Sequence, residues 1–475
     1  MTEAIQILQA VERFLETSQD PVLCEPGEEW LAITPENFAI EARGACAQLQ
    51  AWDQRRNLVR RVTAIESETR GKLALKVARF GKLQGALELI DRPRALRDNR
   101  PLRSARLGFR EQFRRFLRRQ FPAFKLAELS TEADLEHTLS PAYPRALVRQ
   151  GACAWAAIGA APDACHPDGV LTFGLIWLDY LRQREPSLAL QGLVLYLPAA
   201  RAKTTCLRLL FLDPAAAGYR AFVYDNQGIE EPVDLRDYGN LDTHLEAYRR
   251  NSHAPPTVDL PNVETIERSD GELSYRVHGL EFARTADSKP LLRLRSRRAA
   301  ELSRLRSPDA DPRSVLYRRN PEAWLESQVR GNIREIDASL LPAPVYGQVP
   351  AFAAADRGVL DLLAVDHRGR LAVIELKASE DVHLPLQALD YWMRVQWHVA
   401  RREFEAKGYF PGREARCELS CQPPRLLLVS PALDFHPSNE RVLRYFSPEI
   451  PVERVGVGLE WRKELKVMYR SGTPS

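Results

Sequence analysis

The sequence contains little cysteine for its length, and the number is odd. Seven cysteines are spread over 475 residues, unlike the even, closely spaced set of a small disulfide-stabilised secreted domain. They are Cys24, Cys46, Cys153, Cys165, Cys206, Cys417 and Cys421. A reducing compartment fits this pattern, so we expect a cytoplasmic protein.

Long apolar runs are also missing. The longest, residues 188–200, is interrupted by polar side chains, glycine and proline, and a membrane helix needs about 20 apolar residues. Residues 1–16 have the pattern of an acidic amphipathic helix, without the basic and apolar regions of a secretory leader. We therefore expect no membrane partner.

The excess of one charge is small, and lysine is scarce. A formal net charge of +4 does not by itself indicate a nucleic-acid partner. Only 10 of the 67 basic residues are lysine. A lysine within an otherwise informative pattern therefore carries weight.

The length predicts two or three domains, each large enough for a core. Composition and pattern favour a helical and β-hairpin region, a mixed α/β domain of unknown role, an arginine-rich connection and a C-terminal domain. Their predicted bounds are residues 1–125, 126–283, 284–319 and 320–475. The expected fold class is mixed α/β, an α+β multidomain chain, with its oligomeric state left open.

In the first region, residues 1–50 predict two helices around Pro26 and Gly27, and residues 55–91 predict hairpins. An arginine-rich stretch follows, in which phenylalanines recur at helical spacing with arginines on the other face. Its candidate nucleic-acid contacts are Arg114, Arg115, Arg118 and Arg119. Two interpretations stay open: a solvated helix face whose arginines extend into water, or contacts to a phosphate backbone. Residues 284–319 are a second such candidate.

The middle region predicts a helix at residues 171–183 and a hairpin, or one arm of it, at residues 272–284. Its predicted strands are residues 188–199, 204–213 and 219–225.

The C-terminal region is the most informative. Asn320 is suited to cap a helix that begins with Pro321. The later apolar runs, turns and helical patterns give the order αβββαβαβ. That order predicts a central mixed sheet of three to five strands flanked by helices.

Three ionisable residues interrupt the apolar strands of this region. Asp361 lies within Val359–Leu363, and Glu375 and Lys377 follow the run Ala372–Ile374. Side chains two apart on a strand share a face, and Asp361 on the preceding strand reaches that face if the two strands pair through their short turn. Two carboxylates, with the Leu376 carbonyl as a third oxygen, suit Mg²⁺ or Mn²⁺.

Asp361 followed by Glu375-Leu376-Lys377 resembles the D…(D/E)-x-K signature of the PD-(D/E)xK nuclease superfamily, although Leu360 replaces the proline of the literal motif. The string GVLDLLAVDHRGRLAVIELK is most similar to the catalytic core of NucS-type endonucleases. Gln387 and Tyr391 match the Q-x-x-x-Y element of RecB-like members. Glu322 and Glu326 match a helix with E-x-x-L-E before the core.

The resemblance covers about residues 320–460 and implies a restriction-endonuclease-like core that hydrolyses phosphodiester bonds in DNA, with RNA not excluded. It implies that Asp361 and Glu375 bind the metal and that Lys377 positions water or stabilises charge. Gln387 would orient the lysine or the phosphate, with Tyr391 in the same element. Glu322 or Glu326 would complete the acidic shell. The expected protein is an endonuclease of repair, restriction or defence.

Several alternatives stay open. Glu375 and Lys377 could form a structural salt bridge, and the domain could be a catalytically silent nucleic-acid-binding or scaffold module. Cys417 and Cys421 could bind zinc, although buried or free thiols are favoured because no second Cys/His pair lies nearby. Core or surface roles are favoured over chemistry for a further set of residues. These are His383, His398, His436, Trp392 and Trp397.

Overall fold

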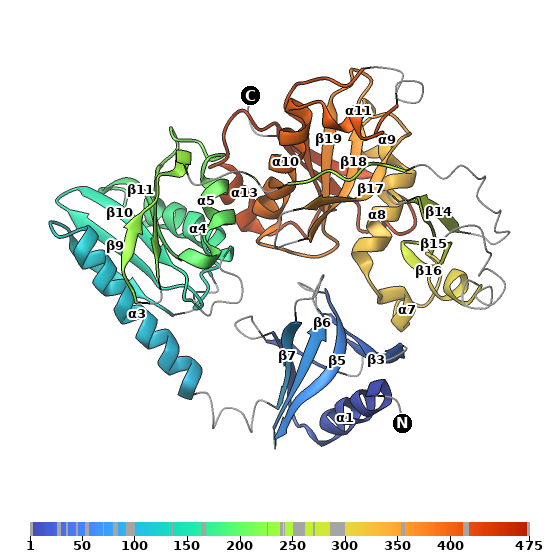
Figure 1. The fold of residues 1–475 in the computed structure, drawn as a ribbon, viewed down its shortest axis with the longest axis horizontal. Helices are drawn as coiled ribbons and strands as arrows, with labels where there is room; N and C mark the ends of the chain where they lie inside the picture. Colours follow the sequence, from blue (N-terminus) through green and yellow to red (C-terminus); the bar gives the residue numbers. More distant parts are fainter. Residues whose placement is uncertain are drawn as a thin grey trace. The chain divides into compact units, whose positions relative to one another are not determined.

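The computed structural model divides into two compact units. Unit 1 comprises Met1–Gly239 and Pro437–Ser447, and unit 2 comprises Asn240–His436 and Pro448–Ser475. The structure describes residues 3–25, 30–34, 37–43, 46–52, 57–69, 71–78, 84–91, 100–132, 134, 136–162, 168–225, 227–237, 241, 243–249, 262–268, 271–285, 300–352, 357–411 and 418–472. The mixed α/β fold class is confirmed (Figure 1).

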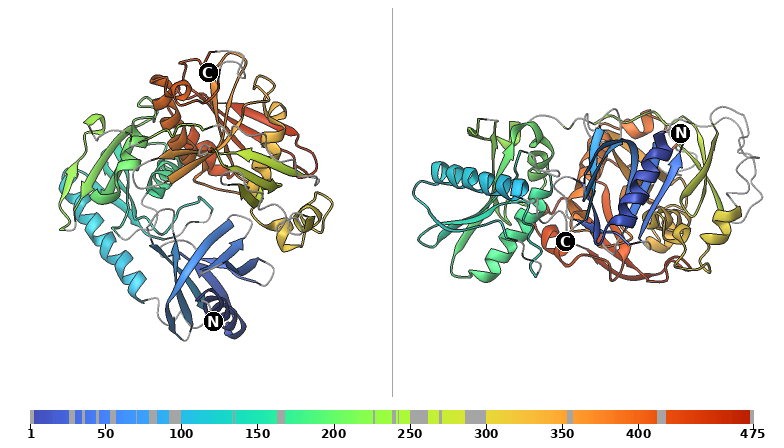
Figure 2. Two further views of the ribbon diagram at one scale, coloured as in Figure 1. Left: turned by 45° about the vertical axis from the view of Figure 1, so that its right-hand side comes forward. Right: turned by 90° about the horizontal axis from the view of Figure 1, so that it is seen from below.

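The first part of unit 1 is a seven-stranded antiparallel sheet with helix α1 (Glu3–Thr17) packed on one face (Figure 2). In the order β2-β1-β7-β6-β5-β4-β3, its strands are Leu31–Ala32, Pro21–Cys24, Gln84–Asp91, Lys72–Ala78, Asn57–Thr69, Cys46–Trp52 and Phe38–Arg43. The predicted hairpins are confirmed, but the second helix predicted before residue 50 is wrong. Alternate residues Ala47, Leu49 and Ala51 enter the core, which is the period of a strand and not of a helix.

The second part of unit 1 is a six-stranded mixed sheet in the order β13-β12-β11-β10-β9-β8. The strands are Glu230–Pro232, Gly218–Tyr224, Ala189–Pro198, Cys153–Gly159, Arg145–Gln150 and Lys125–Ser130, with β10, β11 and β12 parallel. The helical elements are α3 (Arg100–Gln120), α4 (Gly169–Arg184), η1 (Ala199–Arg201), α5 (Lys203–Leu209) and η2 (Leu235–Asp237).

Helix α5 replaces a predicted strand. The helix buries five consecutive residues, Thr205 to Leu209. Unbroken burial shows neither the alternation of a strand nor the spacing of an amphipathic helix. The segment is short and rich in apolar residues, so its sequence does not distinguish the two elements.

Helix α13 (Pro437–Leu443) is distant in sequence from unit 1 but belongs to it. It packs on α4, and the Arg182 guanidinium lies 5.5 Å from the centre of the Tyr445 ring. The N–H of Asp213 donates to the Tyr445 carbonyl at 2.8 Å. The chain therefore leaves unit 2 after β20 (Arg425–Pro431), contributes a helix to unit 1, and returns as β21 (Val452–Val457).

Unit 2 opens with a small antiparallel sheet, which we call the hairpin sheet. Its strands are β14 (Val263–Glu267), β15 (Leu273–Val277) and β16 (Leu280–Thr285), which confirms the predicted hairpin. Leu302 and Leu316, from the segment that contains α7 (Val315–Arg318), pack on its core.

The main sheet of unit 2 has the order β17-β18-β19-β20-β21-β22. Its remaining strands are β17 (Tyr346–Phe352), β18 (Arg357–Val365), β19 (Leu371–Leu376) and β22 (Val467–Gly472), and its helices are α8 (Pro321–Gly331), α9 (Ile333–Ile336), α10 (Leu384–Ala400) and α11 (Glu403–Ala406). The predicted order αβββαβαβ is confirmed, and β22 extends the sheet to six strands. The Asn320 side chain caps α8 by accepting the Ala323 N–H at 3.1 Å.

Two layers of helix enclose this sheet. Trp324 and Leu325 of α8 pack with Leu362, Ile374 and other buried residues of the strands. Residues that alternate with these point to the opposite face, where α10 packs on β19 and β20. Nothing among the described helices is long and apolar enough to cross a membrane.

The observed division differs from the predicted domain bounds at three places. One is α13, which belongs to unit 1 although its residues lie within the predicted C-terminal domain. Phe109, Phe113 and Phe116 of α3 pack on the six-stranded sheet, so this helix does not belong with residues 1–91. The hairpin sheet lies in unit 2, although we grouped its residues with the middle domain. Residues 92–99, at the start of the first arginine-rich segment, and residues 286–299, in the first half of the second, lie outside the described residues.

Arg306 connects three segments of unit 2 while fully buried. Its guanidinium donates to the carbonyls of His278 at 3.0 Å, Leu316 at 2.9 Å and Asn320 at 2.9 Å, and also to that of Arg319. Its centre lies 4.7 Å from the Trp324 ring. The hairpin sheet, α7 and the start of α8 therefore depend on one side chain.

Arg306→Met should lower the free energy of unfolding by about 3 kcal/mol or more, because several buried carbonyls lose their donor. Urea unfolding followed by circular dichroism measures the difference. Arg304→Met is the matched control, since Arg304 is exposed two residues earlier. Equal stabilities of the two variants would contradict the assigned role.

Candidate active site

Asp361 and Glu375 meet through the pairing of β18 with β19. Leu362 pairs with Ile374 in the antiparallel register, so Asp361 lies beside Glu375 on the neighbouring strand. The N–H of Leu376 donates to Asp361 Oδ2 at 2.8 Å. The antiparallel pairing of β18 with β19, on which the prediction for Asp361 depends, is confirmed.

Lys377, directly after β19, lies among carboxylates. Its ammonium nitrogen is 3.8 Å from Glu322 Oε1, 3.9 Å from Glu375 Oε1 and 4.0 Å from Asp381 Oδ2. Only 12% of the Lys377 side chain and 3% of the Glu375 side chain are exposed. The charges therefore interact in a setting that water screens poorly.

This arrangement shifts the protonation of all three groups. Burial raises the pKa of Asp361 to about 7, against the opposing effect of Lys377. Burial also raises the pKa of Glu375, and the negative charge of Asp361 adds to that rise. Burial opposes the charge on Lys377, but Glu322 and the other carboxylates raise its pKa above the usual value. Lys377 is therefore held as an ammonium ion.

Helix α10 supplies the other predicted polar groups. The pKa of Tyr391 is raised by burial first and then by the charges of Glu375 and Asp361. Gln387 lies one turn earlier on the same helix face. Its buried Oε1 has no hydrogen-bond partner among the described residues.

The two glutamates of α8 have different surroundings. Glu322 Oε1 lies 3.8 Å from the ammonium nitrogen of Lys377. Glu326 is buried and forms a close ion pair with Arg330, whose Nη1 also lies 3.5 Å from Glu264 Oε2 on β14. Glu322, and not Glu326, is therefore the acid of this helix that contacts the lysine.

Sequence reasoning missed Asp381, Arg330 and Glu264. Arg330 follows Glu326 by four residues on one helix, and that spacing is a recognisable signal for an ion pair. Asp381 likewise follows Lys377 by four residues, although no regular element links them. Glu264 is far away in sequence, and no local pattern indicates its contact.

The donor set can be compared with the needs of a divalent cation. No three His, Cys, Asp or Glu side chains of the described residues are grouped as ligands of one ion. Glu375 Oε2 is nevertheless buried. Among the residues that the structure describes, it has no hydrogen-bond partner. Two adjacent carboxylates with an unpartnered oxygen fit a cation that takes its remaining ligands from main chain, water or substrate.

The arginine-rich helix is confirmed as a helix with an apolar face on its sheet. Arg119 forms a close ion pair with the buried Glu230, and Arg114 Nε lies 3.5 Å from Glu111 Oε2. Arg115 and Arg118 are exposed. Only these two of the four candidates lack an ion pair within the described ranges.

Most of the histidines and tryptophans for which we expected core or surface roles make contacts that stabilise the fold. His398 is buried between Thr243, at 2.9 Å, and Glu403, and the Trp392 indole donates to the Pro424 carbonyl at 2.8 Å. His383 and His436 are half-buried. The Arg401 guanidinium stacks on Trp397. Cys421 is an exposed free thiol, and Cys417 lies outside the described residues.

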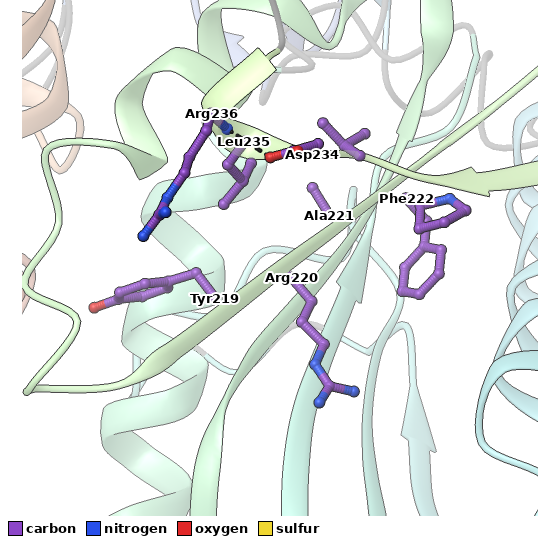
Figure 3. Close-up of a pocket in the computed structure, with 9 residues that line it drawn as sticks. Tyr219, Arg220, Ala221, Phe222, Asp234, Leu235 and Arg236 are labelled. Atoms are coloured by element: carbon purple, nitrogen blue, oxygen red, sulfur yellow. Dashed lines mark hydrogen bonds between the residues drawn. The ribbon is translucent and has the colours of Figure 1, made fainter.

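A surface cavity of about 310 Å³ lies in unit 1 (Figure 3). Its lining residues fall between Tyr219 and Arg236, so it includes none of the acids described around Lys377. Figure 3 shows Tyr219 and Arg236 on one side of β12 and Arg220 on the other. Asp234 is its single acidic lining residue. The cavity therefore has no pair of carboxylates to hold a cation.

Comparison with known proteins gives no relative: no family model, curated protein or solved structure matches this chain.

Asp361→Asn should stabilise the protein in the presence of a chelator, and more at pH 8 than at pH 5. A carboxyl whose folded pKa is raised to about 7 contributes stability that is complete below its unfolded pKa of about 4 and is lost as pH rises through about 7. Asparagine cannot ionise but retains an oxygen for the Leu376 N–H.

Urea unfolding at the two pH values measures this effect, which is at most about 1.4 kcal/mol for each unit of pKa difference. Asp309→Asn, at an exposed position, is the control. Parallel pH dependences of wild type and Asp361→Asn would show that Asp361 ionises as it does in the unfolded chain.

Proposed function

We propose that this chain is a metal-dependent nuclease that hydrolyses phosphodiester bonds in DNA, with a restriction-endonuclease-like core in unit 2. One observation carries the proposal: the buried ammonium ion of Lys377 lies beside Glu375, whose Oε2 is buried and has no hydrogen-bond partner among the described residues. The order αβββαβαβ and the signature residues agree with this assignment.

In this proposal Asp361 and Glu375, with the Leu376 carbonyl, hold Mg²⁺ or Mn²⁺. The bound cation would lower the pKa of water and polarise a phosphoryl oxygen. Hydrolysis forms a bond from the water oxygen to phosphorus and breaks a phosphorus–oxygen ester bond, and the leaving oxygen gains a proton. Negative charge builds up on the phosphoryl oxygens as this happens.

Lys377 serves this reaction as a cation. Because the neighbouring carboxylates raise its pKa, it holds its proton and is unsuited to remove one from water. Its fixed charge stabilises the negative charge that develops on the phosphoryl group. Gln387, whose Oε1 has no partner in the part of the chain that the structure describes, orients the lysine or the scissile phosphate.

A catalytically silent module for nucleic-acid binding or scaffolding is the second candidate. The observation that favours it is that the described acids do not form a three-residue cation site. Mn²⁺ binding separates the two functions, since a silent module has no need of the ion.

Lys377→Ala should reduce Mg²⁺-dependent cleavage about 10²–10³-fold, the typical loss when one preorganised charge contact is removed. The assay uses single-stranded, duplex, branched and mismatched DNA, together with RNA, and Mn²⁺ in parallel. Lys463→Ala is the matched control, since the Lys463 side chain is 55% exposed. Wild-type rates for Lys377→Ala, or no cleavage of any substrate by wild type, would contradict the proposal.

Replacing Arg115 and Arg118 with alanine should weaken DNA binding regardless of sequence. Each lost phosphate contact should reduce the slope of log affinity against log salt by about 0.9. Fluorescence anisotropy at several salt concentrations measures the slope. A double alanine variant of the exposed Arg149 and Arg236 is the control, and an unchanged slope would favour the solvated-face interpretation of α3.

A further inference from the structure

Glu326 lies near the proposed cation site but is engaged elsewhere. Its side chain is only 5% exposed and forms a close ion pair with Arg330, which is itself 14% exposed. Glu322, one turn earlier on the same face of α8, lies 3.8 Å from the ammonium nitrogen of Lys377. Glu326 is therefore within electrostatic reach of the site.

The ion pair is held from two sides. On one side, Glu264 lies 3.5 Å from Arg330 Nη1 and accepts a hydrogen bond from the Ser327 hydroxyl. On the other side, a Cβ at Gly347 would lie 2.8 Å from Arg330 Nη2 and 2.9 Å from Glu326 Oε1. Gly347 of β17 pairs with Leu362, the neighbour of Asp361. The absence of a side chain at this glycine lets the pair lie against the strand next to the site.

We propose that Arg330 is a positioning residue that holds Glu326 away from the cation site of Asp361 and Glu375. This inference rests on the proposed function. Without Glu326, the site offers a cation the two carboxylates of Asp361 and Glu375. Mg²⁺ held by so few protein ligands takes phosphate oxygens of its substrate as further ligands. Arg330 thereby couples cation binding to the nucleic-acid strand, so that the site binds the cation more tightly when substrate is present.

The test is a Mn²⁺ titration of the full chain, with free Mn²⁺ followed by electron paramagnetic resonance, in the presence and absence of a short DNA duplex. For wild type, the duplex should strengthen Mn²⁺ binding. Arg330→Gln should bind Mn²⁺ about tenfold more tightly without the duplex, since a third carboxylate becomes available, and should gain less from the duplex. The double variant Arg330→Gln/Glu326→Gln should bind Mn²⁺ without the duplex about as weakly as wild type does.

Arg334→Gln is the control, because Arg334 is exposed one turn further along the chain. Arg330→Lys keeps a positive charge but loses the two-pronged geometry. Its Mn²⁺ affinity without the duplex should lie between those of wild type and Arg330→Gln. It replaces Arg330→Gln in the test if that variant does not fold. Suppose that wild type binds Mn²⁺ in the presence of the duplex, but that neither Arg330 variant binds Mn²⁺ more tightly than wild type in its absence. This result overturns the present inference and leaves the proposed function standing. If wild type binds no Mn²⁺ under either condition, the proposed function fails with it.

Discussion

A buried lysine needs negative charge around it, and this constraint organises unit 2. Transferring an ammonium ion out of water is unfavourable unless carboxylates lie close by. For Lys377 these come from β19, from α8 and from the loop before α10, at 3.8 to 4.0 Å. Strand register, helix position and loop conformation must therefore all be correct at once, since an error in any of them would leave a charge unpaired.

Local patterns predicted most of unit 2 because its elements have strong local signals. The apolar runs of β18, β19 and β20 are bounded by turns, and Asn320 marks the start of α8. The same reasoning failed for β1 to β4 and for α5. Their apolar segments are so short that they fit the period of a strand and the period of a helix equally well. It placed Asp361, Glu375 and Lys377 together because a hairpin register is a local property. It could not show that Arg330 also contacts Glu264, because Glu264 lies far away in sequence, on another sheet.

The hairpin sheet shows how a distant segment determines the position of helix α8. The His278 ring stacks on Trp324 at 4.8 Å between ring centres. A side chain at Gly279 would overlap the Ala323 carbonyl. This close approach fixes the first turns of α8, where Glu322 lies. The sequence indicated which strands pair within the hairpin, but what packs on its face depends on shape complementarity between segments far apart in the chain.

The place of α13 in unit 1 has a consequence for synthesis on the ribosome. Domains that are continuous in sequence can fold as soon as their last residue emerges. Unit 1 cannot be completed in that way, because α4 obtains its α13 neighbour only after nearly all of unit 2 has been translated. Until then the nascent first half exposes the α4 surface that α13 covers, and the two halves of the chain reach their final structures almost together.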